Sequence, residues 1–333
     1  MSTAIKIVYE NHWNFGIHLA DTLPLIRCGL ELAGFRADIE KPLCPGTLNI
    51  VVENFDDSFA DRLLAAADHG TRFIIVATEF MTGTTFNDFG KPEDVAPDKH
   101  YDNVRYWESR YRNFMRVAER AVAVWHLSEQ QVGVYQATLP CPVGYLPHGY
   151  VEALRRIAFR PDAARDIDFL FTGTLTPYRR EILDTLGRLG YEVKAAPMLT
   201  AHFHREDLVA RTRVALNLRQ HAGWMHPSNN RIHYHLNNGS LLLSEQCAVA
   251  CDLDPFVARS DQIVEAAVAT LESGSFGTRG EAARQSFATA RPMGPLMAEL
   301  VRQTLPRELV DALARTIQHA DPGAPPSNRE TMQ

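Results

Sequence analysis

Short apolar runs alternate with helical patterns along the first 150 residues of the chain. Continuous apolar runs are typical of strands buried on both faces, and apolar residues at every third or fourth position indicate amphipathic helices. Strands are predicted at 5–9, 48–52, 73–77 and 121–125, and helices at 19–33, 58–68 and 101–121. A further helix is predicted after Ser128, with Gln131 at the capping-box spacing. Buried strands that alternate with helices predict a parallel, doubly wound α/β sheet.

The same alternation restarts after residues 146–165, a mixed segment that contains proline and charged residues. Strands are predicted at 168–172, 192–195, 214–218 and 240–243, helices at 177–189, 206–212 and after Ser228, and a helical section at 261–319. The sequence therefore predicts two Rossmann-like domains that face a cleft, at 1–150 and 151–320, the second ending in the helical section. Residues 321–333 are proline-rich and polar, and we expect them to be disordered. A cleft between two such domains is a natural ligand site.

Polar side chains crowd the connection between the predicted strands 214–218 and 240–243. Polar groups at the carboxyl end of a strand and at the start of the next helix form ligand sites in open α/β sheets. We interpret this segment as the binding site of an anionic, hydrogen-bonding ligand such as a nucleoside diphosphate. The residues that would contact this ligand or shape its pocket are Arg219, His226, Ser228, Asn229, Arg231, His235, Asn238, Gly239 and Glu245.

A second candidate site follows the strand at 168–172. Gly173 and Thr174 come at the end of this strand, and Arg179 and Arg180 fall in the first turns of the next helix. A glycine lets the backbone approach a ligand closely, and an arginine can pair bidentately with a phosphate. The alternative is a tight turn that carries two solvated arginines.

Candidate bases for proton transfer lie in the first domain. His12 and His18 belong to a long loop after the first strand, and imidazoles titrate near neutral pH. Glu79 follows the strand at 73–77, where functional residues of such sheets are usually found. The alternatives are a surface loop with incidental histidines and a solvated or helix-capping glutamate.

Composition narrows the function classes. A formal charge of -6 and a pI of about 6.1 give no global reason to expect nucleic-acid binding. The five cysteines are scattered and odd in number, no signal peptide is visible, and no apolar window reaches 18 residues, so we expect a cytoplasmic protein without a transmembrane segment. His-x-His pairs occur at 202–204 and 233–235; the second falls on a predicted helix, where positions i and i+2 do not share a face, so we expect hydrogen-bonding or solvated roles rather than metal binding. Neither half contains a G-x-G-x-x-G turn, which disfavours a nicotinamide enzyme.

The second half of the chain resembles the donor-binding domain of GT-B glycosyltransferases, most closely the CgeB-like, spore-maturation-type group. The resemblance rests on FTG followed by an arginine-bearing helix at 171–180, on VALNLR at 214–219, and on RIHYHLNNGSLLLSE at 231–245. It implies a nucleotide-sugar donor on the C-terminal domain and an acceptor on the N-terminal domain. It also implies a terminal helix that crosses back after Pro292, and no bound metal or other cofactor.

The chain departs from many retaining members of that fold. Those members carry two glutamates eight residues apart before the glycine of the G-x-L-L strand, and the matching positions here hold His226 and Tyr234. The resemblance therefore favours inversion, with His18, His12 or Glu79 as the base. His18 follows a Gly-x-His pattern like that of the catalytic histidine in some inverting members.

The expected function is metal-independent transfer of a sugar, of the hexosyltransferase type, from a nucleoside diphosphate sugar to an acceptor. The acceptor is left open among glycans, lipids, proteins and small molecules. The alternative is a catalytically inactive GT-B-like protein that binds a nucleotide or a glycan.

Overall fold

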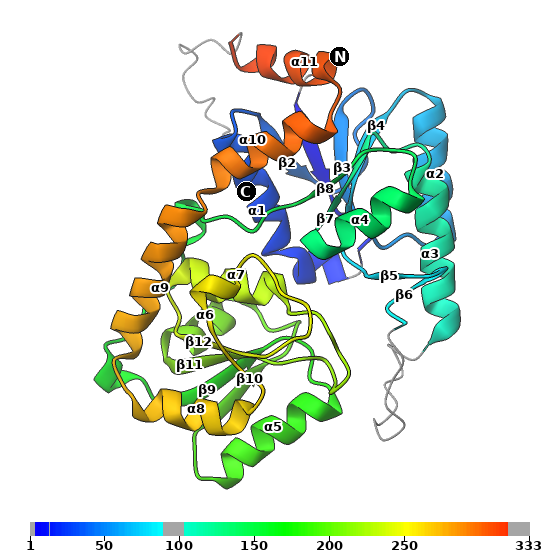
Figure 1. The fold of residues 1–333 in the computed structure, drawn as a ribbon. Helices are drawn as coiled ribbons and strands as arrows, with labels where there is room; N and C mark the ends of the chain where they lie inside the picture. Colours follow the sequence, from blue (N-terminus) through cyan, green and yellow to red (C-terminus); the bar gives the residue numbers. More distant parts are fainter. Residues whose placement is uncertain (1–3, 13, 89–102, 319–333) are drawn as a thin grey trace, which may run out of the picture.

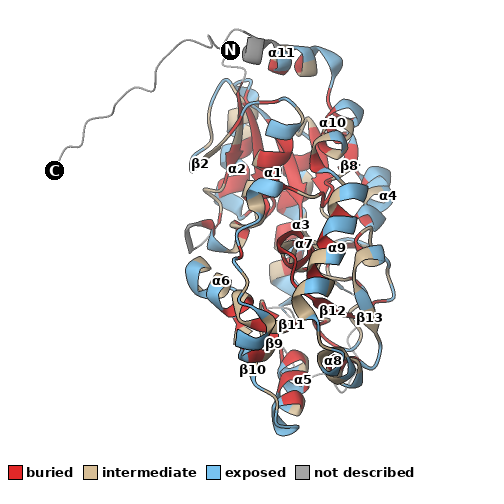
Figure 2. Cartoon of the chain, turned by 90° about the vertical axis from the view of Figure 1, so that its left-hand side faces the viewer, coloured by how far each residue is buried: buried red, intermediate tan, exposed pale blue. Residues whose placement is uncertain are grey.

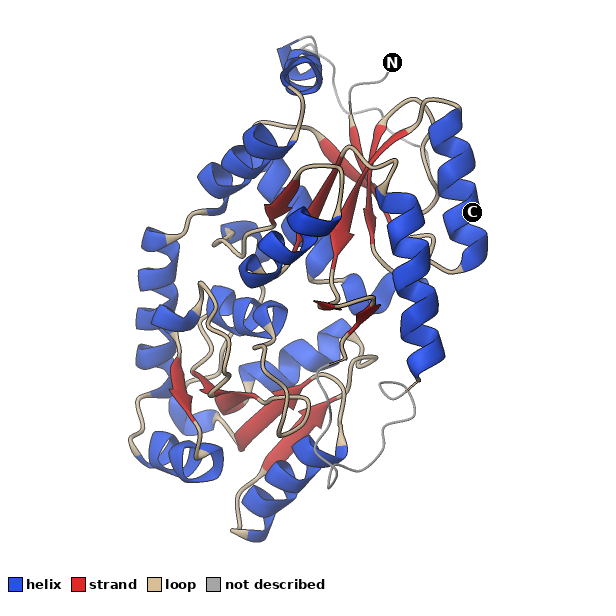
Figure 3. Cartoon of the chain, turned by 45° about the vertical axis from the view of Figure 1, so that its right-hand side comes forward, coloured by secondary structure: helices blue, strands red, loops and turns tan. Residues whose placement is uncertain are grey.

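The computed structural model describes residues 4–12, 14–88 and 103–318, which form two α/β domains with helices on both faces of each sheet (Figures 1 and 3). The first sheet is parallel throughout, with the order β2-β1-β3-β4-β7-β8. Its strands are β1 Ile5–Val8, β2 Ala37–Glu40, β3 Leu48–Val52, β4 Arg72–Ala77, β7 Ala123–His126 and β8 Val143–Tyr145. The other elements are the 3-10 helix η1 Asn14–Leu19, the helices α1 Thr22–Leu32, α2 Asp57–Asp68, α3 Val104–Ala118 and α4 Glu129–Thr138, and the hairpin of β5 Met81–Thr82 with β6 Thr85–Phe86.

The second sheet is also parallel, in the order β10-β9-β11-β12-β13. Its strands are β9 Ile167–Thr172, β10 Val193–Ala196, β11 Thr212–Asn217, β12 Leu242–Glu245 and β13 Ala258–Ser260. The helices that flank it are α5 Pro177–Arg188, α6 His202–Ala210, α7 Asn229–Asn238 and α8 Ile263–Glu272, with short 3-10 turns η2 Glu152–Leu154, η3 Asp162–Ala164 and η4 Asp254–Phe256. The predicted doubly wound α/β architecture of both halves is confirmed.

Alternating side chains of the central strands pack into two separate hydrophobic cores, one on each face of the first sheet. Ile50 and Val52 of β3 pack into the core under α1, whereas Val51 packs into the core under α2 and α3. Successive side chains of a strand point to opposite faces, so a strand covered by helices on both sides must be apolar at every position. Figure 2 shows the resulting buried layers along the strands.

The C-terminal helices α9 Phe276–Ala290, α10 Met293–Thr304 and α11 Arg307–Gln318 return the chain to the first domain (Figure 1). Met293 and Met297 belong to the same core as α1. A Cβ atom added at Gly29 of α1 would lie 2.7 Å from Met293 Cε, so the missing side chain permits this close packing. Trp125 of β7 donates a buried hydrogen bond of 2.9 Å to Thr304 Oγ1.

Some local predictions differ from the structure. The expected helix at 19–33 begins only at Thr22, because residues 14–19 form η1, and the helix expected at 206–212 spans His202–Ala210. The predicted capping box does not form: Ser128 makes no side-chain cap bond, and the Gln131 side chain accepts a hydrogen bond of 2.9 Å from the backbone of Met81. The tail at 321–333 lies outside the described residues.

Candidate active site

A cavity of about 390 Å³ lies between the two domains, at the carboxyl ends of both sheets. The strand order of each sheet reverses direction here, because β1 lies between β2 and β3 in the first sheet and β9 lies between β10 and β11 in the second. Such switch points open a crevice between neighbouring strand-to-helix loops. We call residues 78–80 and 126–128, with His18, Asp21 and α3, the N-terminal wall. Residues 172–174, 196–198 and 227–231 form most of the C-terminal wall.

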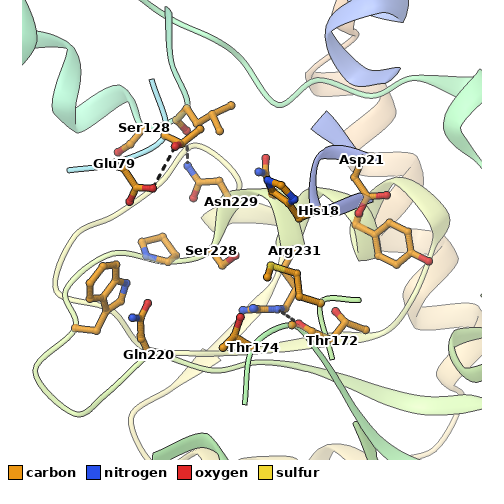
Figure 4. Close-up of a pocket in the computed structure, with 18 of the residues that line it drawn as sticks. His18, Asp21, Glu79, Ser128, Thr172, Thr174, Gln220, Ser228, Asn229 and Arg231 are labelled. Carbon is orange, nitrogen blue, oxygen red and sulfur yellow. Dashed lines mark hydrogen bonds between the residues drawn. The ribbon is translucent and has the colours of Figure 1, made fainter. Parts of the chain in front are cut away.

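Arg231 lies beside Thr172 and Thr174 in the C-terminal wall (Figure 4), and Gly173 is part of the same cavity lining. Arg231 Nη1 donates a hydrogen bond of 2.7 Å to Asn217 Oδ1, and Nε donates to the carbonyl oxygen of Thr172. Gly173 has a φ of +130°, and a Cβ there would lie 2.5 Å from Arg231 Nη2. The glycine therefore both permits the turn and leaves the volume that the guanidinium occupies.

Arg179 also lines the cavity, and its hydrogen bonds go to backbone oxygens. It donates to the carbonyl oxygens of Thr174 at 2.8 Å, Arg219 at 2.9 Å and Leu218 at 3.1 Å. These bonds tie the loop after β9 to the loop after β11. Thr176, the N-cap of α5, adds a 2.7 Å bond to the carbonyl oxygen of Gln220.

The N-terminus of α7 points its first residues at the cavity. Ser228 is the N-cap and makes no side-chain cap bond, and Asn229 donates a bond of 3.1 Å to the carbonyl oxygen of Leu127 in the other domain. The first turn of a helix carries backbone N–H groups without intrahelical acceptors and a partial positive charge. With Arg231, this wall can hold an anionic group.

His12 and His18 are joined directly. His12 Nδ1 lies 2.9 Å from His18 Nε2, and His12 Nε2 lies 3.1 Å from the carbonyl oxygen of Val52. His18 lines the cavity, whereas His12 is 8% exposed and lies behind it. Burial, with the neighbouring His18, lowers the pKa of His12 to about 3, and burial with the nearby Arg110 charge lowers the pKa of His18. Both imidazoles are therefore neutral at pH 7.

Glu79 belongs to a buried cluster that the sequence analysis did not find. Arg110 forms a two-point ion pair with Glu53 and reaches Glu79 Oε1 at 3.0 Å. Asn87 donates a 2.7 Å hydrogen bond to the other oxygen of Glu79. Burial raises the pKa of Glu53 against the opposing effect of Arg110, and the pKa of Arg110 rises because the two carboxylates outweigh its burial.

Two contacts between the domains flank the cavity. Asp21 accepts two hydrogen bonds of 2.7 Å from Arg205 of α6, and the Arg205 guanidinium lies 4.3 Å from the ring centroid of Tyr234. Phe80 of the first domain stacks on His226 of the second, with centroids 3.8 Å apart. Asp21, Arg205 and Phe80 were not among the sequence candidates, and their proximity to the second wall depends on how the domains pack.

Several sequence candidates lie outside the lining. Glu245 pairs with Arg219 at 2.7 Å and accepts a hydrogen bond from Tyr178, behind the C-terminal wall. Arg180 lines a separate surface depression beside α5 and β10. His226 is held in the stack with Phe80.

The end of α7 likewise lies away from the cavity. His235 is buried between Thr172 Oγ1 at 3.2 Å and Ser240 Oγ at 3.1 Å. Asn238 Oδ1 accepts a hydrogen bond of 2.8 Å from the backbone of Arg156, and Gly239 ends the helix with a φ of +86°. In the structure these residues support the helix, whose other end reaches the cavity.

The described residues contain no group of three or more His, Cys, Asp or Glu side chains placed to hold a metal ion. Within the same ranges, no helix is both long and apolar enough to cross a bilayer.

Comparison with known proteins gives only distant likenesses. No protein-family model matches the chain, and no curated protein gives a significant sequence match. The N-terminal domain of a Candida albicans trehalose-6-phosphate phosphatase aligns over 81% of this chain and 71% of its own, at 11% identity and a TM-score of 0.48. The apo form of the lipopolysaccharide outer core galactosyltransferase WaaB aligns over 95% and 99%, at 10% identity and a TM-score of 0.39. A GtfA/B complex bound to UDP and GlcNAc aligns over 78% and 57%, at 12% identity and a TM-score of 0.33. These likenesses are too distant to assign an activity to this chain.

Proposed function

We propose that the chain is a glycosyltransferase that transfers a sugar from a nucleoside diphosphate sugar to an acceptor hydroxyl. The observation that carries the proposal is the pairing of two unlike walls around one cavity. The C-terminal wall offers Arg231 and the N-terminus of α7, and the N-terminal wall offers a neutral imidazole and a carboxylate. One wall suits a departing anion, and the other suits proton removal from a nucleophile.

The diphosphate of the donor would lie against Gly173, Thr174 and the first turn of α7. Ser228 and Asn229 would contact the phosphate and the sugar, and Arg231 would pair with the phosphate oxygens. Arg179 and the residues behind the wall would hold the two loops in register. No metal is needed in this scheme, because the guanidinium and the helix dipole neutralise the charge that develops on the leaving group.

The acceptor would approach from the N-terminal wall. Its oxygen forms a bond to the anomeric carbon, the bond from that carbon to the diphosphate oxygen breaks, and the hydroxyl proton passes to a candidate base on this wall, His18 or Glu79. Attack opposite the leaving group inverts the anomeric configuration. Glu79 is the second candidate base, and its bonds to Arg110 and Asn87 fix the carboxylate in place.

Arg231→Ala tests the donor site. We expect nucleoside diphosphate affinity, measured by isothermal titration, to fall by roughly tenfold or more, as for loss of a hydrogen bond to a charged group. Arg231→Lys keeps the charge and should lose less, whereas Arg188→Ala, an exposed arginine of α5, should bind as the wild type does. Unchanged affinity in Arg231→Ala would remove the proposed phosphate site. Donor binding without sugar transfer to any acceptor would support the alternative of a binding protein.

A further inference from the structure

Asn87 stands directly after β6, and its side chain joins the hairpin of β5 and β6 to the wall of the cavity. Its Oδ1 accepts a hydrogen bond of 3.0 Å from the backbone N–H of Phe80, and its own backbone N–H donates one of 2.8 Å to the carbonyl oxygen of Phe80. Its Nδ2 donates a bond of 2.7 Å to Glu79 Oε2. Asn87 and Glu79 both line the cavity, where Figure 4 shows Glu79. One amide group therefore contacts both the hairpin and the carboxylate.

The partners of Asn87 determine which end of its amide faces the carboxylate. A backbone N–H can only donate, so the atom that faces Phe80 must be the amide oxygen. The nitrogen end then faces Glu79, and an ionised carboxylate can only accept, so this contact pairs a donor with an acceptor. Asn87 has a φ of +59°, a left-handed conformation that asparagine adopts more readily than most side chains do. Both the backbone and the contacts therefore suit asparagine at this position.

Glu79 is also held through its other oxygen. Arg110 Nη2 lies 3.0 Å from Oε1, and Thr78 Oγ1 donates to the same oxygen at 3.4 Å. Because both oxygens accept from fixed donors, the carboxylate cannot turn without losing a hydrogen bond. The side chain is still 21% exposed and lines the cavity, and an ionised carboxylate has about four lone-pair positions. A hydroxyl in the cavity can therefore reach it.

His18 is less well placed to take a proton than Glu79 is. His18 Nε2 faces His12 at 2.9 Å, and His18 Nδ1 has almost no solvent-accessible surface. Neither ring nitrogen is therefore presented to an acceptor in the cavity. Of these two candidate bases, Glu79 is the one that presents a partly exposed carboxylate.

We propose that Glu79 is the base of the transfer and that Asn87 is the positioning residue that holds its carboxylate at the cavity wall. On transfer, the acceptor O–H bond breaks and an O–H bond forms at Glu79, while the electron pair of the anomeric C–O bond leaves with the diphosphate. The source of the proton rests on the proposed function, whereas the contact between Asn87 and Glu79 does not.

The charged and titratable groups that face Glu79 come from four elements. Among the described residues they are Arg110 and Tyr106 of α3, Glu53 after β3, His126 of β7 and Tyr135 of α4. Burial raises the pKa of both tyrosines and lowers the pKa of the imidazole to about 4, so these three groups stay neutral between about pH 5 and pH 8. Arg110 stays charged, and Glu53 can titrate together with Glu79. The Glu79 carboxyl must therefore be observed separately.

Carbon-13 NMR of the glutamate side-chain carboxyls tests the contact without any substrate, and Glu79→Gln assigns the Glu79 signal. Asn87→Asp and Asn87→Gly both tolerate the positive φ. Aspartate keeps an oxygen for Phe80 and places a second carboxylate against Glu79, whereas glycine removes the donor without adding a charge. We expect the titration midpoint of Glu79 to rise in Asn87→Gly and to rise further, by about one pH unit or more, in Asn87→Asp. Thr84→Asp adds the same charge at the exposed turn of the hairpin and should keep the wild-type midpoint.

Activity measurements then separate the base from its support. Once a donor and an acceptor are in hand, Glu79→Gln should lower kcat by at least roughly a hundredfold, and the acid limb of kcat/KM should move to higher pH in both Asn87 variants. A Glu79 midpoint that is the same in the wild type, Asn87→Asp and Asn87→Gly would overturn the positioning role. Wild-type kcat in Glu79→Gln would overturn the role of Glu79 as the base. Shifted midpoints without sugar transfer by the wild type would instead count against the glycosyltransferase proposal.

Discussion

Gly173 shows how one residue can hold a charged wall in place. Its φ of +130° is a conformation that other residues adopt only with strain, and Arg231 fills the space where a side chain would be. We expect Gly173→Ala to cost about 1–3 kcal/mol of stability and to weaken nucleoside diphosphate binding by displacing Arg231. Urea unfolding and titration calorimetry would measure both effects.

Gly187 of α5 provides the matched control for this substitution. A Cβ at Gly187 would meet no atom within 4 Å, and alanine is the better helix former. Gly187→Ala should keep the wild-type affinity and raise the free energy of unfolding by up to about 1 kcal/mol. If Gly173→Ala and Gly187→Ala had the same affinity and the same free energy of unfolding, the role assigned to Gly173 would be wrong.

The ion pair between Arg110 and Glu53 is buried, because both side chains are less than a tenth exposed. Removing one partner of a buried pair leaves the other charge without compensation. We expect Arg110→Met to lower the free energy of unfolding by about 3–5 kcal/mol, and the double variant with Glu53→Gln to recover part of that loss. Arg116 lies on the same helix as Arg110 and forms an exposed pair with Asp61 of α2, so Arg116→Met should cost at most about 1 kcal/mol. A small effect of Arg110→Met in urea unfolding would argue against the cluster as a structural support of Glu79.

At the scale of elements, α7 has one end that lines the cavity and one end that bonds to the rest of the fold. Asn237 uses its amide to bond both the N–H and the carbonyl of Val151, at 2.9 and 3.0 Å. These bonds fix the segment that joins the two domains. Asn237→Ala should therefore cost about 1–3 kcal/mol of stability, because it leaves buried backbone groups unpaired, with nucleoside diphosphate affinity unchanged. If Asn237→Ala lowered the nucleoside diphosphate affinity and left the stability unchanged, Asn237 would belong to the binding site rather than to the end of α7 that bonds to the rest of the fold.

The sequence predicted elements well where burial is continuous. The β3 and β4 strands are nearly wholly apolar, and their runs are plain in the sequence. By contrast, β2 has one buried residue among four, and β13 has none, so their edge positions give no apolar signal. Short strands of this kind are set by pairing with a neighbour rather than by their own pattern.

The candidate site was predicted in part for a similar reason. His18, Glu79, Gly173 and Arg231 follow strands or begin helices, and the structure brings all four to one cavity. The partners of these residues were not predictable, because they come from distant parts of the chain. Glu53 and Arg110 are 57 residues apart, and Asp21 and Arg205 are 184 apart, so only the packed domains reveal the pairs.

At the scale of the whole molecule, buried histidines link stability to pH. Among the described residues, burial is the largest cause of a lowered pKa at His12, His18, His126, His148, His226, His233 and His235. A histidine in the unfolded chain binds a proton below about pH 6.5, whereas the pKa values of six of these side chains in the folded protein lie near 3 to 4. Between about pH 6.5 and pH 4 the unfolded state therefore binds more protons than the folded state, and the free energy of unfolding must fall as the pH falls.

Urea unfolding at pH 7.5 and pH 5.0, at constant ionic strength, measures this linkage. Each histidine that stays neutral in the folded state contributes a loss of up to about 1.4 kcal/mol per pH unit below 6. We expect a large drop in the unfolding midpoint at pH 5.0. Equal or greater stability at pH 5.0 would show that these imidazoles take up protons in the folded protein.

The most direct test of the donor site is a thermal-shift screen with uridine, guanosine, thymidine, adenosine and cytidine diphosphates and their common sugar conjugates. A ligand that binds the folded state raises Tm by mass action, by an amount that grows with its concentration over Kd. We expect one diphosphate to raise the Tm of the wild type clearly and that of Arg231→Ala much less. No shift with any of these ligands at millimolar concentration would contradict a nucleotide-sugar site in this cleft.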